Sequence, residues 1–148
     1  MPTRRPTVPV FSIGYQGKKV AALCDQLVDA GVTVLVDVRA VAWSQRPEFR
    51  KTALANALKA KGIEYVHCKV AGNPYRAASK EPDGWVDCER MYRAHVRANK
   101  GVLDAVEEQV RRGPVALFCY EAERACCHRG VLLDELRDRV AKLAVTDL

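Results

Sequence analysis

The segment from Cys119 to Arg129 holds the densest group of reactive side chains in the chain: three thiols, an imidazole, two carboxylates and two guanidinium groups. Cysteine, histidine and glutamate are the residue types of nucleophilic and acid–base chemistry. A thiol at a helix start and close to arginines has a lowered pKa and becomes a nucleophilic thiolate. We therefore predict a nucleophilic or otherwise reactive thiol at Cys119 or Cys127. Glu121 and His128 are the predicted acid and base.

Each of these side chains also has a purely structural interpretation. Free cysteine is among the most buried residue types, so Cys119 can simply end a buried strand. Glu121 can form an ion pair with Arg39 or Arg129 instead of exchanging protons. The cysteines and the histidine offer enough donor atoms for a metal ion, but there is no C-x-x-C pair, and adjacent residues rarely bind one ion together. We expect no bound metal.

Two shorter polar motifs follow other apolar runs. Asp37-Val-Arg39 ends the second run, and Tyr15 stands just beyond the first. Arg39 and Arg129 are predicted to bind an anionic group of a substrate, and Tyr15 and Asp37 to line the same site. The structural alternatives are a Tyr15 ring packed on the sheet edge and an ion pair at Asp37. The first turn lacks the G-x-G-x-x-G pattern, so no nicotinamide or flavin is expected, nor any other cofactor.

Strand and helix patterns alternate along the chain. Continuous apolar runs predict buried strands, and apolar residues at helical spacing predict amphipathic helices. The predicted strands cover residues 8–14, 32–37, 63–68 and 114–118, and the predicted helices cover 20–28, 51–61, 85–96, 102–110 and a last segment with Leu132, Leu136, Val140 and Leu143 on one face. This alternation favours an α/β fold, a three-layer sandwich around a mostly parallel central sheet of about four strands.

Short, right-handed connections favour the strand order 3-2-1-4. In that order the first and fourth strands are neighbours, and the winding of the chain reverses between them. Open α/β sheets bind ligands at such a switch point, outside the carboxyl ends of the strands. The residues predicted to meet in one crevice there are Tyr15, Asp37, Arg39, Glu121 and His128. The segment 72–84, with two prolines and two glycines, is expected to be a functional loop.

Composition sets the class of protein. The 148 residues, 49% hydrophobic and 28% charged, suit one globular domain over 1–148, with 1–7 as a flexible N-terminal arm. A formal net charge of +6 favours anionic partners, either a small substrate or nucleic acid. The start of the chain lacks the apolar stretch of a signal peptide, and no run is long enough to span a membrane. We expect a cytoplasmic protein with no membrane partner; nothing indicates its oligomeric state.

Short motifs spread from Val10 to Leu136 resemble those of the domain-of-unknown-function 488 family. They are Ser12-Ile-Gly-Tyr15, Val36-Asp-Val-Arg39, Gly62-Ile-Glu-Tyr65, Gly72-Asn-Pro74 and Cys119-Tyr-Glu121 with Cys127-His-Arg129. The resemblance implies a small bacterial-type cytoplasmic α/β protein whose shared polar set is Tyr15, Asp37, Arg39, Cys119, Glu121, Cys127, His128 and Arg129. It implies no reaction. The chain departs from the family pattern at Ala42, where proline is usual, at Ala71, where leucine is usual, and at the extra thiol Cys126.

Three hypotheses of different classes follow. The first is an enzyme that acts on a small anionic or nucleotide-like substrate in a crevice of cysteine, glutamate, histidine and arginine. The second is a nucleic-acid-associated binding module, in which the crevice arginines contact phosphates and the cysteines are structural. The third is a thiol redox or metal-dependent sensor. Binding to nucleic acid should weaken steeply with salt, whereas turnover of a small molecule need not.

Overall fold

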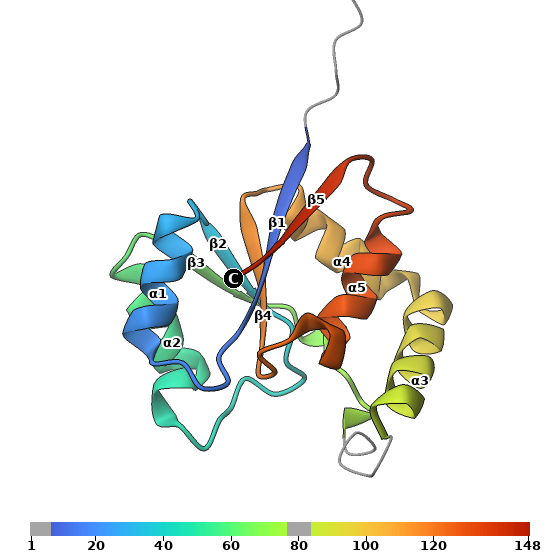
Figure 1. The fold of residues 1–148 in the computed structure, drawn as a ribbon, viewed down its shortest axis with the longest axis horizontal. Coiled ribbons are helices and arrows are strands. Elements are labelled where there is room, and N and C mark those ends of the chain that lie inside the picture. Colours follow the sequence, from blue (N-terminus) through green and yellow to red (C-terminus); the bar gives the residue numbers. More distant parts are fainter. Residues whose placement is uncertain (1–6, 77–83) are drawn as a thin grey trace, which may run out of the picture.

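The computed structural model describes residues 7–76 and 84–148 as alternating strands and helices (Figure 1). The strands are β1 (Val8–Gly14), β2 (Val34–Asp37), β3 (Glu64–His67), β4 (Val115–Cys119) and β5 (Leu143–Asp147). The helices are α1 (Val20–Asp29), α2 (Lys51–Lys59), α3 (Gly84–Ala98), α4 (Lys100–Val110) and α5 (His128–Leu136), with short 3₁₀ helices η1 (Pro47–Phe49), η2 (Lys69–Ala71) and η4 (Arg124–Cys126). The predicted N-terminal arm, apart from Thr7, and the middle of the predicted 72–84 loop lie outside the described residues.

The strands form one sheet in the order β3-β2-β4-β1-β5, and every neighbouring pair is parallel. The predicted α/β class with a parallel sheet is confirmed, but the predicted order 3-2-1-4 is wrong, because β4 lies between β2 and β1. The physical reason is burial: all five residues of β4 are buried, and the strand pairs with a neighbour on each side. Such a fully apolar strand is most stable at the centre of a sheet.

The last helix is shorter than predicted, and a fifth strand follows it. Helix α5 ends at Leu136, whereas the pattern extended it through Val140 to Leu143. Lys142 has φ 59°, in the left-handed region, and this turn directs the chain back along β1. Lysine gives no sequence signal for such a turn, which glycine usually supplies. The missed strand β5 is half-exposed at the edge of the sheet.

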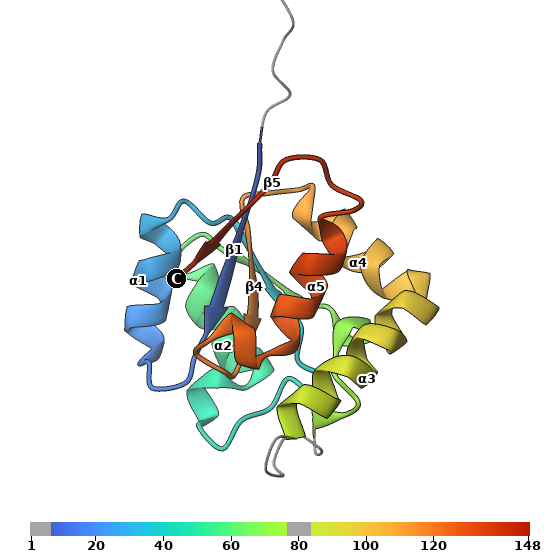
Figure 2. The same cartoon turned by 45° about the vertical axis from the view of Figure 1, so that its right-hand side comes forward.

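Helices cover both faces of the sheet. Figures 1 and 2 show α1 and α2 on one face and α3, α4 and α5 on the other. Alternate strand residues serve the two layers, as the pleat requires: Leu35 and Phe118 pack with α1 and α2, whereas Val36 and Leu117 pack on the opposite side. By the same alternation Cys119 belongs to the layer of α3, α4 and α5.

Ion pairs fasten α3 to α5. Glu135 of α5 is nearly buried and accepts hydrogen bonds from Arg93 at 3.0 Å and Arg97 at 3.1 Å. Burial would raise the pKa of Glu135, but these two arginines outweigh it and hold the pKa below its ordinary value. Within the described part of the chain, no helix is long and apolar enough to cross a membrane.

Candidate functional site

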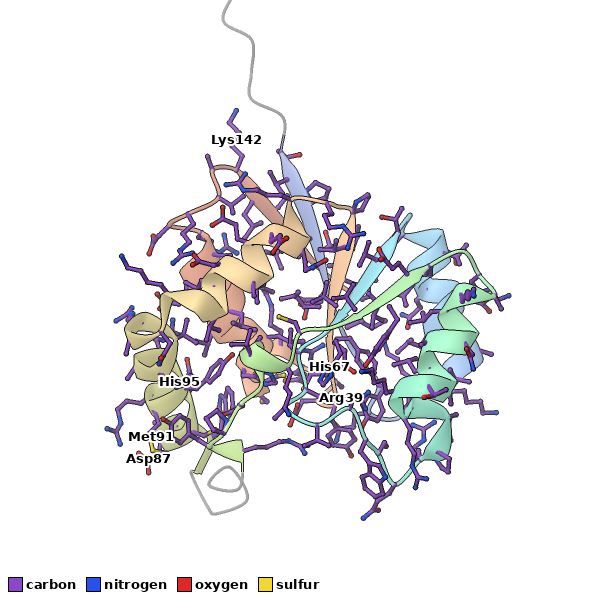
Figure 3. All side chains as sticks on the ribbon, turned by 180° about the vertical axis from the view of Figure 1, so that it is seen from behind. Arg39, His67, Asp87, Met91, His95 and Lys142 are labelled. Atoms are coloured by element: carbon purple, nitrogen blue, oxygen red, sulfur yellow. The ribbon has the colours of Figure 1, made fainter. Side chains whose placement is uncertain are left out.

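Three strand ends come together at the carboxyl edge of the sheet. Gly14 of β1 stands opposite Cys119 of β4, and Asp37 of β2 stands opposite Phe118. The true strand order therefore brings Asp37 closer to the end of β4 than the predicted order would. Seen from behind in Figure 3, Arg39 and His67 lie next to each other at the ends of β2 and β3.

Asp37 and Arg39 form a buried, bidentate ion pair. The Arg39 Nε donates to Asp37 Oδ1 at 2.9 Å, and Nη2 donates to Oδ2 at 2.7 Å. The Arg39 backbone N–H and the Tyr65 hydroxyl also donate to the carboxylate. Burial alone would lower the pKa of Arg39, but the hydrogen bonds and charge of Asp37 raise it above its ordinary value. Arg39 is thus a fixed, permanently charged group.

Aromatic rings and a histidine hold this arginine in place. Its guanidinium carbon lies 5.0 Å from the centre of the Phe118 ring and 5.5 Å from that of Tyr15. Tyr15 itself stacks on Phe49 at 4.4 Å and is almost fully buried. His67 Nε2 lies 2.8 Å from the Arg39 carbonyl oxygen and fixes the main chain there. These contacts leave one side of the guanidinium facing a pocket.

On the other side of β4, two thiols and an imidazole form a compact buried cluster. His128 Nδ1 lies 3.7 Å from the Cys127 sulfur and 3.9 Å from the Cys119 sulfur. Cys119 ends β4, Cys127 is the extended N-cap of α5, and His128 is the first residue of that helix. The strand end and the helix start therefore direct three soft donor atoms to one point.

The hydrogen bond of the second ring nitrogen fixes the histidine tautomer. His128 Nε2 lies 2.7 Å from the Val38 carbonyl oxygen, which can only accept. The proton of neutral His128 is therefore on Nε2, and Nδ1 presents a lone pair to the two sulfur atoms. This nitrogen can take a proton from a thiol or bind a metal ion.

Arg129 is fully buried and bonds the same cluster. Its Nε donates to the Cys127 sulfur at 3.3 Å, and its Nη2 donates to the main-chain oxygen of Glu121. Among the described residues no carboxylate forms a salt bridge with it, and its Nη1 has no hydrogen-bond partner. A buried guanidinium needs a compensating negative charge. The Cys127 sulfur is the group that can carry it, as a thiolate.

The electrostatic effects on the two thiols are opposite. Burial raises the pKa of Cys127, but a hydrogen bond from Cys119, the interaction with the protonated form of His128 and the charge of Arg129 hold it well below the ordinary value. A hydrogen bond to Cys127, burial and the negative charge of Cys127 raise the pKa of Cys119 well above that value. Burial would lower the pKa of His128, but the Cys127 thiolate raises it. These opposite shifts favour ionisation of Cys127 over ionisation of Cys119.

Glu121 lies at the border of this cluster. Its carboxylate is 3.4 Å from Arg76, so the structural alternative of an ion pair with Arg39 or Arg129 does not hold, and Arg129 bonds the Glu121 main chain instead. Burial and the negative charge of Cys127 raise the pKa of Glu121. Its Oε2 is buried, without a hydrogen-bond partner in the described part of the chain. A carboxylate in this state can accept a proton or a hydrogen bond from a ligand.

A pocket of about 430 Å³ opens between the two polar groups of residues. Buried Cys119, His128 and Arg39 and the exposed rings of Trp43 and Tyr120 all contribute to its wall. The lining residues that the structure describes are Tyr15, Arg39, Ala40, Val41, Trp43, Asn73, Arg76, Cys119, Tyr120 and His128. This described lining contains two arginines and no carboxylate. Cys127 borders a second, wider hollow of about 610 Å³ beside α5.

Two glycines let the loops close over this pocket. A Cβ on Gly14 would lie 1.8 Å from the Glu121 carbonyl oxygen, and one on Gly72 would lie 2.3 Å from the Cα of Ala40. Only glycine permits such close backbone approach. Gly72 thereby places Asn73, whose amide donates to Cys88 at 3.1 Å and whose oxygen caps the following turn.

The predicted site residues fall into two groups. Tyr15, Asp37 and Arg39 lie on the α1 and α2 side of β4, and the thiols, His128 and Arg129 on the α5 side. The pocket joins them through Tyr15, Arg39, Cys119 and His128, while Asp37 and Arg129 are buried behind it and Glu121 stands outside its lining. Arg129, predicted to bind substrate, therefore acts through the Cys127 sulfur, and its role toward a substrate stays a prediction.

Other pocket and supporting residues were not predicted as site residues. They are Trp43, Tyr65, His67, Asn73, Arg76 and Tyr120. Tyr65 and His67 belong to the third strand, whose carboxyl end lies at the same edge as the others, so their position was a usable signal. Tyr65 and Asn73 also stand within motifs of the resemblance. Trp43 and Arg76 lie in irregular segments, where periodicity carries no information.

Comparison with protein families gives one match, to the domain of unknown function DUF488, over residues 19–136. The matched segment contains Asp37, Cys119 and Cys127 and begins after Tyr15. Comparison with curated proteins gives no significant match, and comparison with solved structures gives none.

Proposed function

This chain belongs to the DUF488 family, and we propose that it is an enzyme acting on a small, nucleotide-like anion in the pocket of Arg39 and Trp43. Cys119, Cys127 and His128 form its reactive centre. One observation carries this proposal: Cys119 and His128 line the same pocket as Arg39. A substrate in this pocket contacts a fixed positive charge and the reactive centre at once.

The lining supports the substrate class. Arg39 and Arg76 are the charged groups of its described part, which contains no carboxylate, and this favours an anion. Tyr15, Tyr120 and Trp43 contribute flat apolar surfaces, which suit the ring of a nucleobase or another planar group. Trp43 is 54% exposed, although large apolar side chains are usually covered. A stacked ligand would cover it.

Binding to nucleic acid draws less support from the surface. Most of the exposed arginines lie beside carboxylates, for example Arg90 with Asp87 and Arg112 with Glu64. In the part of the chain that the structure describes, much of the positive charge is thus divided among local ion pairs, which leaves less of it free to contact phosphates.

The substrate class can be tested by calorimetry with three probes: adenosine monophosphate, adenosine alone and inorganic phosphate alone. The monophosphate should bind at least about tenfold more tightly than either half, because stacking on one ring contributes about 1–3 kcal/mol. Trp43→Ala and Arg76→Ala should each weaken it by about tenfold. Arg90→Ala removes an equally charged but distant side chain and should change nothing.

Two results would overturn the proposal. One is that none of the nucleoside monophosphates binds, or that Trp43→Ala and Arg76→Ala leave the affinity unchanged. The other is binding that falls steeply with salt and increases with the length of an oligonucleotide, which would indicate a nucleic-acid module. Ligands that pass this test are then incubated with the protein and followed by mass spectrometry. Their turnover should be lost in Cys127→Ser and kept in Cys126→Ser, which alters the exposed neighbouring thiol.

A further inference from the structure

We infer that Cys119, Cys127 and His128 form a zinc site whose fourth coordination position opens toward the pocket. This inference rests on the proposed function only for the direction of that open position. The sequence favoured the opposite expectation, because it contains no C-x-x-C pair and because Cys127 and His128 are adjacent. The fold removes that objection, since Cys127 has the extended conformation of an N-cap and His128 the conformation of the first helical residue.

The donor atoms have nearly the separations that a tetrahedral ion requires. With Zn–S bonds of about 2.3 Å and Zn–N bonds of about 2.0–2.1 Å, tetrahedral angles place sulfur and nitrogen about 3.6 Å apart. The observed separations from His128 Nδ1 are 3.7 Å to Cys127 and 3.9 Å to Cys119. All three donor atoms lie within 4.8 Å of one another. The same geometry places the two sulfurs about 3.8 Å apart. Shifts of up to about 1 Å at the sulfur atoms would therefore bring the side chains onto one ion.

The groups behind the donors are those that support a metal ion. A metal-binding histidine almost always donates its other ring N–H to a carbonyl or carboxylate, which orients the ligating lone pair. His128 does this with the Val38 carbonyl at 2.7 Å. Arg129 Nε donates to the Cys127 sulfur at 3.3 Å, which orients the second ligand. Each ligand thus points at the common centre before any ion binds.

The two buried thiols can also supply the charge that a divalent ion requires. Two thiolates neutralise Zn²⁺, and Arg129 donates a hydrogen bond to one of these sulfurs. The buried Glu121 Oε2, which has no partner among the described residues, lies on the side of Cys127.

The type and burial of the donors select the metal. Two sulfurs and one imidazole are soft ligands that disfavour Mg²⁺ and Ca²⁺ and suit zinc. All three side chains are at most 3% exposed, so the site excludes bulk water. Two cysteines, one histidine and an open position form a ligand set of catalytic zinc centres, in which the ion polarises a bound oxygen. Zinc would thus act as a Lewis acid on the anion in the pocket.

The test is metal uptake by the full-length chain after treatment with a chelator. One Zn²⁺ per chain should remain bound after gel filtration, and Cys119→Ser or Cys127→Ser should lower the affinity at least about 100-fold. Cys126→Ser removes the thiol next in sequence, which is exposed and outside the cluster, and should bind as the wild type does. A wild-type chain that retains no zinc, or a Cys127→Ser chain that retains it fully, would overturn the inference.

Cobalt substitution provides a readout that does not depend on how the variants fold. Wild-type protein with Co²⁺ should show strong thiolate-to-metal charge-transfer absorption and the intense visible bands of a tetrahedral ion. Octahedral spectra without charge transfer would exclude this site. Zinc should also protect Cys119 and Cys127, but not Cys126, from alkylation.

The outcomes separate this inference from the proposed function. Adenosine monophosphate is titrated into the chelated protein, in which Trp43 and Arg76 are intact. If the ligand binds there but zinc does not bind to the protein, the inference fails and the proposed function stands. If zinc binds and the cobalt protein shows the predicted spectrum, but adenosine monophosphate does not bind, the metal site is supported and the proposed substrate class fails. Trp43→Ala should leave zinc affinity unchanged in either case.

Discussion

Replacing Asp37 by asparagine tests whether the buried ion pair organises the edge of the sheet. The two side chains have the same shape, so the change removes charge without leaving a cavity. Asp37 is fully buried, and its carboxylate accepts hydrogen bonds from the Arg39 side chain, the Arg39 backbone and the Tyr65 hydroxyl. An asparagine amide would turn a donor toward these donors. It would also leave Arg39, which is 6% exposed, without a carboxylate partner in the described part of the chain.

The expected loss is large. Removing one partner of a buried pair costs about 3–5 kcal/mol, because the remaining charge stays desolvated. For a chain of this length each kcal/mol lowers the melting temperature by about 2–4 °C, so Asp37→Asn should melt about 6–20 °C below the wild type. Glu48→Gln is the matched control. Its ion pair with Arg46 has a similar distance of 3.0 Å but is partly exposed, so it should cost at most about 1 kcal/mol.

Urea denaturation with circular dichroism and tryptophan fluorescence measures both variants. The midpoint of Asp37→Asn should fall while the slope stays constant, since the surface exposed on unfolding is unchanged. Adding Arg39→Met to Asp37→Asn should restore much of the stability, because the unpaired charge is then gone. A loss below about 1 kcal/mol in Asp37→Asn, or no recovery in the double variant, would refute the reasoning.

Two further changes test other parts of the fold. Glu135→Gln should cost about 1 kcal/mol at neutral pH: the two arginines lower the pKa of Glu135 from 4.5, so its stabilisation is complete above that value and disappears as the pH falls through the lowered pKa. A difference in unfolding free energy that persists at acid pH would contradict this. Gly14→Ala should cost about 3 kcal/mol, because its Cβ would overlap the Glu121 backbone, whereas Gly101→Ala, with open space in α4, should stabilise by about 0.5–1 kcal/mol. Thermal unfolding measures both, and equal effects would show that the loop yields at little cost.

The layers of the fold were predictable from local pattern, but the order of the strands was not. Val34-Leu-Val and Val115-Ala-Leu-Phe are apolar on both faces, which identified them as buried parallel strands. The prediction then placed β1 beside β2, because consecutive elements are usually neighbours. In the structure β4 lies between β1 and β2. This position depends on the packing of the whole sheet, and no residue of the β1–β2 connection indicates it.

The site was predictable as a location and only partly as an arrangement. Residues that follow parallel strands must meet at one edge, so Asp37 and Cys119 could be placed there from sequence alone. Which helical layer each side chain enters depends on its position in the strand, because successive side chains point to opposite faces. Phe118 therefore faces α1 and α2, whereas its neighbour Cys119 faces the other layer. The partner of Arg39 was open for the same reason. Its spacing from Asp37 along the chain does not show whether it pairs with Asp37 or with Glu121.

The two charged groups of residues at this edge differ in how they achieve neutrality, and this difference indicates where chemistry occurs. The Asp37–Arg39 pair is neutral by itself, and its hydrogen bonds leave it rigid. Arg129 is equally buried, but its partners are a sulfur and a carbonyl oxygen. Without a bound metal ion, this charge favours ionisation of Cys127. A rigid neutral pair can hold a substrate in position without reacting, whereas a buried cation beside two thiols keeps one sulfur ready to donate electrons.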